Sequence, residues 1–154
     1  KSSIGKILSK KLNLDFIDID KKIEENENST ISDIFEKRGE SYFRKIEENI
    51  SINYLKLENK IISLGGGGYI NQLIRKQCSK NCSTFWLNWK NETIMKRINN
   101  SKKRPLAMKL NSFEMRKLII NRAKIYNLSD YKINCDKLDK NQILKKIIKL
   151  YENY

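Results

Sequence analysis

Hydrophobic positions along the chain change their spacing from one segment to the next, which indicates alternating helices and strands. Residues 2–12 carry Ile4, Ile7, Leu8 and Leu12 at the spacing of one helix face, and the segment DFIDID that follows is typical of a short strand ending in carboxylates. The same patterns predict helices at 30–39, 41–57, 70–80, 91–98, 112–124 and 140–154, and strands in KIISL, STFWLNW and YKINC. Strands separated by helices predict an α/β fold with a parallel sheet between two helical layers.

Polar residues and glycines follow the predicted strands, where parallel α/β sheets bind their ligands. Asp18 and Asp20 close the first strand, Gly65–Gly68 follow the second, and Asp136 follows the last. Residues i and i+2 of a strand point to the same side, so both carboxylates should face one site, where they would suit a hydrated Mg²⁺ and a base for a hydroxyl group. Successive glycines let backbone N–H groups approach a ligand with no side chain between.

Composition adds bounds to this picture. The chain has 154 residues, of which 39% are hydrophobic, and its mean hydropathy is −0.66. These values predict a single globular domain over residues 1–154. No apolar run approaches the roughly 18 residues of a membrane helix, and no signal-peptide pattern is present, so we expect no membrane association.

The formal net charge of +14 raises the question of a polyanionic partner. Basic residues are scattered among acidic ones and form no stripe interleaved with aromatic residues, so we expect no nucleic-acid binding, and the positive field suits a small anionic substrate such as ATP. The absence of histidine excludes His-based triads and His metal ligands. Cys78, Cys82 and Cys135 have no metal-binding spacing, and we expect reduced thiols in a cytoplasmic protein.

Several basic residues stand where phosphoryl transfer needs charge. Lys1 and Ser2 look like the end of a G-x-x-x-x-G-K-[ST] loop and open a helix, as such loops do. Arg44 and Glu47 lie three residues apart on one predicted helix face and can form an ion pair. A fixed guanidinium can hold a substrate carboxylate with two hydrogen bonds. Arg104 lies in an irregular segment that could close over phosphates as a lid.

Taken together, the motifs resemble the shikimate kinase family over essentially the full chain. Six motifs follow the family's order and approximate spacing: KSS (which is similar to the family's GKS), FIDID, ISDIFEKRGESYFRKIE, SLGGGG, RPL and R-x-x-x-Y. The resemblance implies a three-layer αβα kinase fold with a five-stranded parallel sheet in the order 2-3-1-4-5. It implies ATP-dependent phosphorylation of the 3-hydroxyl of shikimate, with substrate-binding helices at about 20–58 and a lid at about 99–111.

The resemblance also implies roles on the nucleotide side of the site. Lys1 would hold the transferring phosphate, Ser3 would add a phosphate contact, and Ser2 and Asp18 would hold Mg²⁺. Arg97 would stack on the adenine and Arg104 would neutralise the γ-phosphate. Further adenine contacts near Asp136 stay open.

On the substrate side, Asp20 would bind shikimate hydroxyls and orient or deprotonate the nucleophile. Arg44 and Arg122 would grip the carboxylate, with Glu47 positioning Arg44. Gly65 and Gly67 would shape the glycine loop, and Gly66 would donate its backbone N–H to shikimate. Phe35 and Phe43 would form a wall of the substrate site. Family members usually carry Ala where this chain has Gly68, and we expect little effect.

The family's G-x-x-x-x-G loop and the strand before it would precede Lys1. We therefore expect the sequence to be a fragment, or to be inactive as it stands. Two alternatives remain from this resemblance, a related small-molecule kinase such as a gluconate kinase and a non-catalytic kinase-like domain. A third class, a nucleic-acid-binding module, rests only on the net charge. We expect a monomer.

Overall fold

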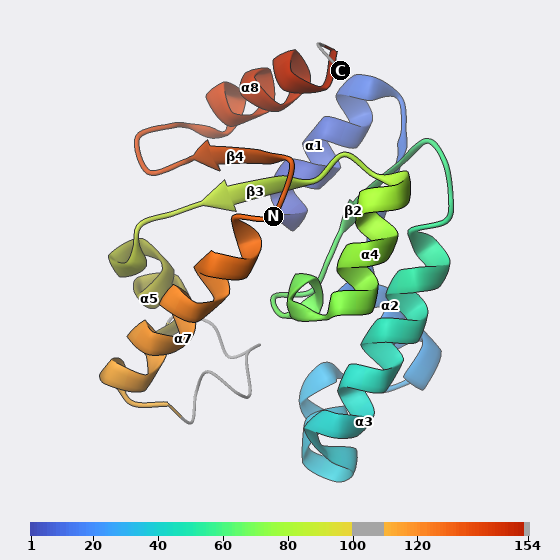
Figure 1. The fold of residues 1–154 in the computed structure, drawn as a ribbon. Coiled ribbons are helices and arrows are strands. Elements are labelled where there is room, and N and C mark those ends of the chain that lie inside the picture. Colours follow the sequence, from blue (N-terminus) through green and yellow to red (C-terminus); the bar gives the residue numbers. More distant parts are fainter. Residues whose placement is uncertain (100–109, 153–154) are drawn as a thin grey trace.

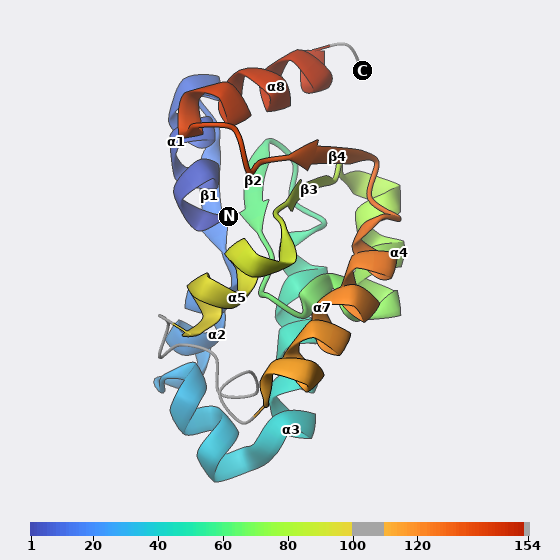
Figure 2. The same ribbon diagram turned by 90° about the vertical axis from the view of Figure 1, so that its left-hand side faces the viewer.

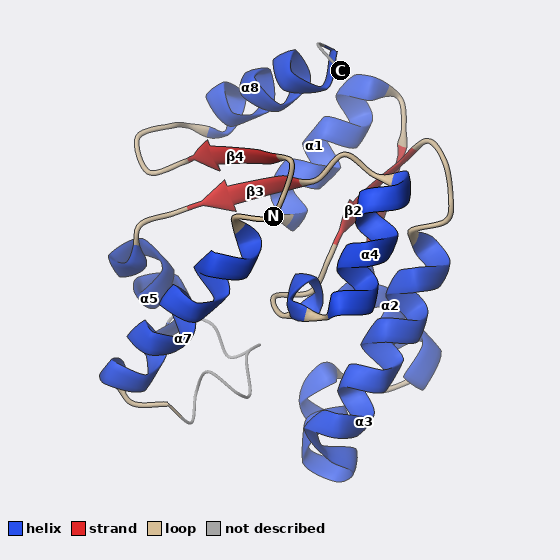
Figure 3. Ribbon diagram, viewed as in Figure 1, coloured by secondary structure: helices blue, strands red, loops and turns tan. Residues whose placement is uncertain are grey.

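The computed structural model describes residues 1–99 and 110–152 (Figure 1). Its strands are β1 Asp15–Asp18, β2 Lys60–Ser63, β3 Phe85–Asn88 and β4 Tyr131–Asn134. Its helices are α1 Ser2–Leu12, α2 Ile19–Glu27, α3 Ile31–Tyr54, α4 Gln72–Asn81, α5 Asn91–Asn99, α7 Ser112–Tyr126 and α8 Lys140–Glu152, with a short 3₁₀ turn, η1, at Gly68–Ile70. Helices and strands alternate as the sequence pattern predicts (Figure 3).

The strands form two parallel pairs. β1 pairs with β2, with Asp15 opposite Lys60 and Asp18 opposite Ser63, and β3 pairs with β4, with Phe85 opposite Tyr131. Parallel neighbours need a long crossover, which α2 and α3 supply in the first pair and α5 and α7 in the second. Within residues 1–99 and 110–152 each pair forms a separate two-stranded sheet, so the predicted order 2-3-1-4-5, whose central strand would precede Lys1, stays a prediction.

Helices cover both faces of the strands. Figure 2 shows α1 and α4 on opposite sides of β2, in the three-layer arrangement. On one side, Ile4 and Leu8 of α1 pack with Ile133 of β4 and Ile143 of α8 in one buried cluster. On the other side, one buried cluster between the end of α3 and α4 contains Leu55, Ile74 and Cys78. These apolar faces are the ones that the helical spacing predicts.

The strand predicted in DFIDID extends beyond the end of the observed strand β1, Asp15–Asp18. The strand stops at Asp18, which is the N-cap of α2, and Asp20 lies in the first turn of that helix. The prediction that Asp18 and Asp20 project from one strand face is therefore wrong. Ile19 and Ile23, one helical turn apart, are both 0% exposed, so α2 packs its apolar face into the core and carries Asp20 with it.

Helix α3 confirms a break that the sequence predicts. The two predicted helices, 30–39 and 41–57, are joined in one element whose Gly39 has φ 77° and ψ 175°. Only glycine adopts this conformation at low cost, so Gly39 allows the sharp kink.

The structure also contains no helix, among the described residues, that is long and apolar enough to cross a membrane.

Candidate active site

The start of α1 meets the ends of β1 and β2. The Nζ atom of Lys1 lies 3.5 Å from Oδ2 of Asp20, and the hydroxyl oxygens of Ser2 and Ser63 are 3.5 Å apart. Ser63 is also the ladder neighbour of Asp18. The chain thus brings together the lysine, the serine and both carboxylates that the sequence singles out, although Asp20 reaches this place from α2 and not from a strand. Ser3 is exposed on the first turn of α1.

Asp18 carries an unusual oxygen. Its Oδ1 atom is buried and has no hydrogen-bond partner among the residues that the structure describes. A buried carboxylate oxygen without a partner costs free energy, so such atoms in native proteins have a role or a bound ligand. Neighbouring hydroxyls at Ser2 and Ser63 make the surroundings an oxygen-rich site of the type that Mg²⁺ prefers.

Arg44 and Glu47 form the ion pair that their spacing predicts. Nη1 of Arg44 lies 2.5 Å from Oε2 of Glu47, and the Glu47 residue is 2% exposed. Burial raises the pKa of Glu47, the Asp20 charge raises it further, and the charges of Arg44 and Arg122 oppose the shift. These influences show that Asp20, Arg44, Glu47 and Arg122 share one electrostatic environment.

The glycine loop lies against these charged groups. A Cβ atom at Gly65 would come within 2.5 Å of Oε1 of Glu47 and 2.7 Å of Oδ1 of Asp20. At Gly67 it would lie 2.7 Å from Nη1 of Arg44. Side chains at these two positions would collide with the site, which explains the glycines by close approach. Gly66 is exposed and has open space where a Cβ would be, so its backbone can meet a ligand.

Two side chains of α7 donate hydrogen bonds to the same backbone oxygen of the glycine loop. The carbonyl oxygen of Gly66 accepts a hydrogen bond from Nη1 of Arg122 at 3.2 Å and another from the hydroxyl of Tyr126 at 2.6 Å. Arg122 was a predicted site residue, whereas no role was assigned to Tyr126. The i,i+4 spacing in R-x-x-x-Y, which puts both side chains on one helix face, was the signal that could have found it.

The predicted aromatic residues lie together under Arg44. The rings of Phe35 and Phe43 have centroids 4.6 Å apart, and the guanidinium carbon of Arg44 lies 5.2 Å from the Phe43 ring centroid. Phe43 is 4% exposed and belongs to the core cluster beneath β1 and α2, while Phe35 is half-buried. The pair therefore supports the helix that carries Arg44 as well as the edge of the site.

Around Asp136 the structure adds detail that the sequence left open. The Asp136 carboxylate accepts hydrogen bonds from the backbone N–H of Lys90 at 2.6 Å and from the Thr93 hydroxyl at 2.8 Å, which ties the end of β4 to the start of α5. Arg97, predicted to stack on adenine, has its guanidinium carbon 3.8 Å from the ring centroid of Trp89. Arg104 and most of the predicted lid, 99–111, lie outside the described residues.

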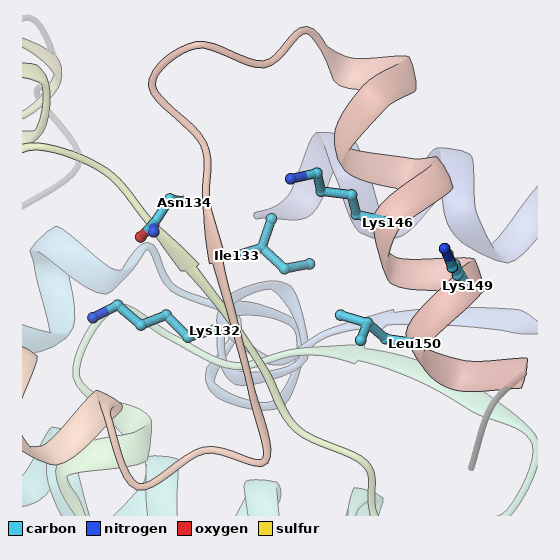
Figure 4. A pocket seen from close by; sticks show the side chains of 6 residues that line it. All are labelled: Lys132, Ile133, Asn134, Lys146, Lys149 and Leu150. Atoms are coloured by element: carbon cyan, nitrogen blue, oxygen red, sulfur yellow. The ribbon is translucent and has the colours of Figure 1, made fainter.

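A separate hollow of about 400 Å³ lies between β4 and α8, away from these residues (Figure 4). It is lined by Lys132, Ile133, Asn134, Lys146, Lys149 and Leu150. None of these is a predicted site residue. Lys132 comes from β4, and Lys146 and Lys149 come from α8, so basic side chains line the hollow from two elements.

Two features define the class of protein. A lysine at a helix N-terminus beside a carboxylate can bind and neutralise phosphate, and the arginines around the glycine loop can bind an anionic acceptor. In a parallel α/β fold, this arrangement is that of an enzyme that transfers a phosphoryl group to a small molecule.

Comparisons with known proteins name the family. Residues 1–152 match the family described as "Shikimate kinase". A shikimate kinase from Sulfurihydrogenibium sp. (strain YO3AOP1) is 39% identical over 148 residues, covering 96% of this chain and 89% of that protein. One from Bacillus subtilis (strain 168) is 35% identical over 154 residues, covering 96% and 81%.

Solved structures agree with the sequence comparisons. The crystal structure of shikimate kinase from Aquifex aeolicus VF5 has a TM-score of 0.88 at 34% identity and covers 99% of this chain and 89% of that one. The Acinetobacter baumannii enzyme in complex with shikimate has a TM-score of 0.91 at 25% identity, with coverage of 98% and 86%.

The chain belongs to the shikimate kinase family. It is a phosphotransferase whose phosphoryl donor is ATP and whose acceptor is shikimate, and it has the mixed α/β kinase fold of that family. The sequence-based predictions of the family, the enzyme class and the acceptor are thus confirmed, and the gluconate kinase alternative has no support from these relatives.

Proposed function

We propose that this chain transfers the γ-phosphoryl group of ATP to the 3-hydroxyl of shikimate at the site built from α1, α2, α3, α7 and the glycine loop. The observation that carries the proposal is the convergence of two arginines on that loop. Arg122 donates to the Gly66 carbonyl, the Arg44 guanidinium lies against Gly67, and the Asp20 carboxylate lies against Gly65. Two cations and one carboxylate suit an acceptor with one carboxylate and several hydroxyls.

Arg44 and Arg122 grip the shikimate carboxylate in this proposal. Glu47 positions Arg44, with which it forms a short, largely buried ion pair. The N–H of Gly66 donates to shikimate, Gly65 and Gly67 shape the loop, and Phe35 and Phe43 wall the site. The close approach of these glycines to Glu47, Asp20 and Arg44 supports this part of the proposal.

Asp20 binds shikimate hydroxyls and orients or deprotonates the 3-hydroxyl. Its position supports that role, because the carboxylate lies between the glycine loop and the Lys1 ammonium. Lys1 holds the transferring phosphate, and Ser3 adds a phosphate contact. Phosphoryl transfer depends on positioning and charge neutralisation more than on covalent catalysis, so a carboxylate and a lysine suffice without histidine.

Ser2 and Asp18 hold Mg²⁺ in this proposal, and the unpartnered, buried Oδ1 atom of Asp18 fits that use. The ion would supply positive charge that neutralises the ATP phosphates. Arg97 stacks on the adenine from α5. Arg104 neutralises the γ-phosphate from a lid at about 99–111, of which residues 100–109 lie outside the described residues.

We propose further that residues 1–154 form a single domain with substrate-binding helices at about 20–58, and that it acts as a monomer. The β1–β2 and β3–β4 pairs would be the outer pairs of a five-stranded sheet in the order 2-3-1-4-5. That order counts the family's first strand, so β1 to β4 would be its strands 2 to 5. The presence of two parallel pairs of consecutive strands supports this arrangement, in which they would be the neighbours 2-3 and 4-5. A cytoplasmic location remains a prediction; Cys78, Cys82 and Cys135 are free thiols, as it requires.

The proposed acceptor contacts are tested by calorimetric titration of shikimate into variants of the two arginines. We expect Arg122→Leu and Arg44→Leu each to weaken shikimate binding about 10- to 100-fold, because each removes a charge-assisted contact. ADP binding should stay within about twofold. Unchanged shikimate affinity in both variants would remove the basis of the proposed clamp. Mass spectrometry of the product with shikimate or gluconate as acceptor then separates the two kinase alternatives.

A further inference from the structure

Trp89 and Arg97 form a contact that the family resemblance does not explain. Trp89 follows β3 directly, and Arg97 lies near the end of α5. The guanidinium carbon lies 3.8 Å from the centroid of the indole ring, which is contact distance over the ring face. An arginine in this position is attracted by the π electrons and loses rotamers that a free surface arginine would sample.

Both partners are held by their surroundings. The Trp89 ring packs against the buried cluster that contains Ile4 and Leu8 of α1. The start of α5 is fixed by Asp136, which accepts hydrogen bonds from the Lys90 N–H and the Thr93 hydroxyl. The indole is therefore a fixed support, whereas Arg97 is exposed.

The contact lies close to the phosphate end of the site. Ile4 belongs to the buried cluster against which Trp89 packs, and it lies one helical turn after Lys1. A planar guanidinium with one face on an indole can offer its other face to a flat aromatic ring, and a purine is such a ring. A nucleotide whose phosphates lie at Lys1 would have its base within the neighbourhood of α1, β3 and α5.

We propose that Trp89 is a positioning residue for the nucleotide: it holds the Arg97 guanidinium flat, so that indole, guanidinium and purine stack in that order. This inference rests on the proposed contact of Arg97 with adenine. Trp89 does not touch the nucleotide. It lowers the entropy that Arg97 loses on binding, which is how preorganisation increases affinity.

Calorimetric titrations with ADP and with inorganic tripolyphosphate test this proposal, because the second ligand has no base. We expect Trp89→Leu and Arg97→Leu each to weaken ADP binding about fivefold, as for loss of a cation–π contact. Affinity for tripolyphosphate should stay within about twofold. The double variant should bind ADP no more weakly than Arg97→Leu alone, because both act through one stack. Trp89→Phe keeps an aromatic face and should recover most of the affinity.

The outcomes separate this inference from the proposed function. If Arg97→Leu binds ADP as tightly as the unmodified protein, the adenine role of Arg97 is wrong. If Arg97→Leu weakens ADP binding and Trp89→Leu does not, only the positioning role of Trp89 is wrong. Equal losses for ADP and tripolyphosphate in Trp89→Leu would also overturn it, since they would reveal a general defect of packing around α1.

A second measurement applies even where Trp89→Leu does not fold. The chain has two tryptophans, so Trp86→Phe leaves Trp89 as the single indole fluorophore. We expect ADP to change the emission of that protein and tripolyphosphate to leave it unchanged, because only ADP adds a ring to the stack. An emission that does not respond to ADP contradicts the proposal.

Discussion

At the scale of single residues, the site depends on how closely charged side chains approach the glycine loop. Glu47 is 2% exposed, yet it contacts Arg44 and lies where any Cβ on Gly65 would collide with it. The sequence could predict the Arg44–Glu47 pair because helical spacing alone brings the two together. It could not predict the contact of Trp89 with Arg97, because that contact depends on how α5 packs against the end of β3.

The Gly65→Ala substitution tests this close approach. A Cβ there would meet Oε1 of Glu47 at 2.5 Å and Oδ1 of Asp20 at 2.7 Å, so both carboxylates must move. Displacements of about 1 Å in an active site cost on the order of 100-fold in rate, and we expect a loss of that size in kcat/KM for shikimate. Gly68→Ala is the matched control, because its nearest contact would be an ordinary 3.5 Å. Equal activity in the two variants would contradict the role given to Gly65.

Removing the Tyr126 hydroxyl tests the support of the Gly66 carbonyl. We expect Tyr126→Phe to raise KM for shikimate about 3- to 10-fold, the value of one hydrogen bond, and to leave KM for ATP unchanged. Tyr69→Phe serves as control, since that hydroxyl donates instead to the carbonyl of Leu128 at 3.3 Å. If the two substitutions affect steady-state kinetics alike, Tyr126 has no special part in the site.

The buried carboxyl of Glu47 predicts a pH dependence of stability. Burial raises its folded-state pKa above the ordinary value of 4.5, so the ionised form is the one that folding disfavours. The contribution of Glu47 to the free energy of unfolding is full below pH 4.5, and it is lost as the pH rises through the raised folded-state pKa. Relative to Glu47→Gln, the unmodified protein should therefore lose free energy of unfolding from about pH 4 upward. Urea denaturation at a series of pH values measures this difference, and a constant difference would contradict the assignment.

At the scale of elements, sequence patterns located most helices and strands, and the errors have identifiable causes. The break at Gly39 could be predicted because glycine commonly ends helices. Helix α2 could not, since DFIDID alternates like a strand, and the packing of α2 against the core through Ile19 and Ile23 is a tertiary effect. Asp20 consequently approaches Lys1 from a helix N-terminal turn.

The kink in α3 leads to a prediction for stability. Gly39 has φ 77° and ψ 175°, a conformation that other residues adopt only with strain. We expect Gly39→Ala to lower the free energy of unfolding by about 1–3 kcal/mol, even though open space surrounds the position. Ser41→Ala, at an exposed position two residues along the same helix, should change it by less than about 0.5 kcal/mol. Chemical denaturation compares them, and a Gly39→Ala protein as stable as the control would show that the kink can relax.

At the scale of the whole molecule, the alternation of elements predicted an α/β fold, and the likeness to solved shikimate kinases confirms it, whereas the placement of chemistry at the strand ends stays a prediction. The single five-stranded sheet could not be tested by residues 1–99 and 110–152, which form two parallel pairs. The net charge of +14 carried little information on function, because the arginines that matter are distinguished by position and not by number. Contacts across elements, not composition, turn the predicted residues into one site.

Phosphorylation of shikimate by this chain is measured by the rate of ADP formation. The measurement compares the protein expressed from its complete reading frame with and without shikimate, at saturating ATP and Mg²⁺, with gluconate as the alternative acceptor. We expect ADP formation that depends on shikimate and falls at least about 10-fold in Arg122→Leu at low shikimate concentration. ADP formation that is independent of shikimate, or equally fast with gluconate, would contradict it.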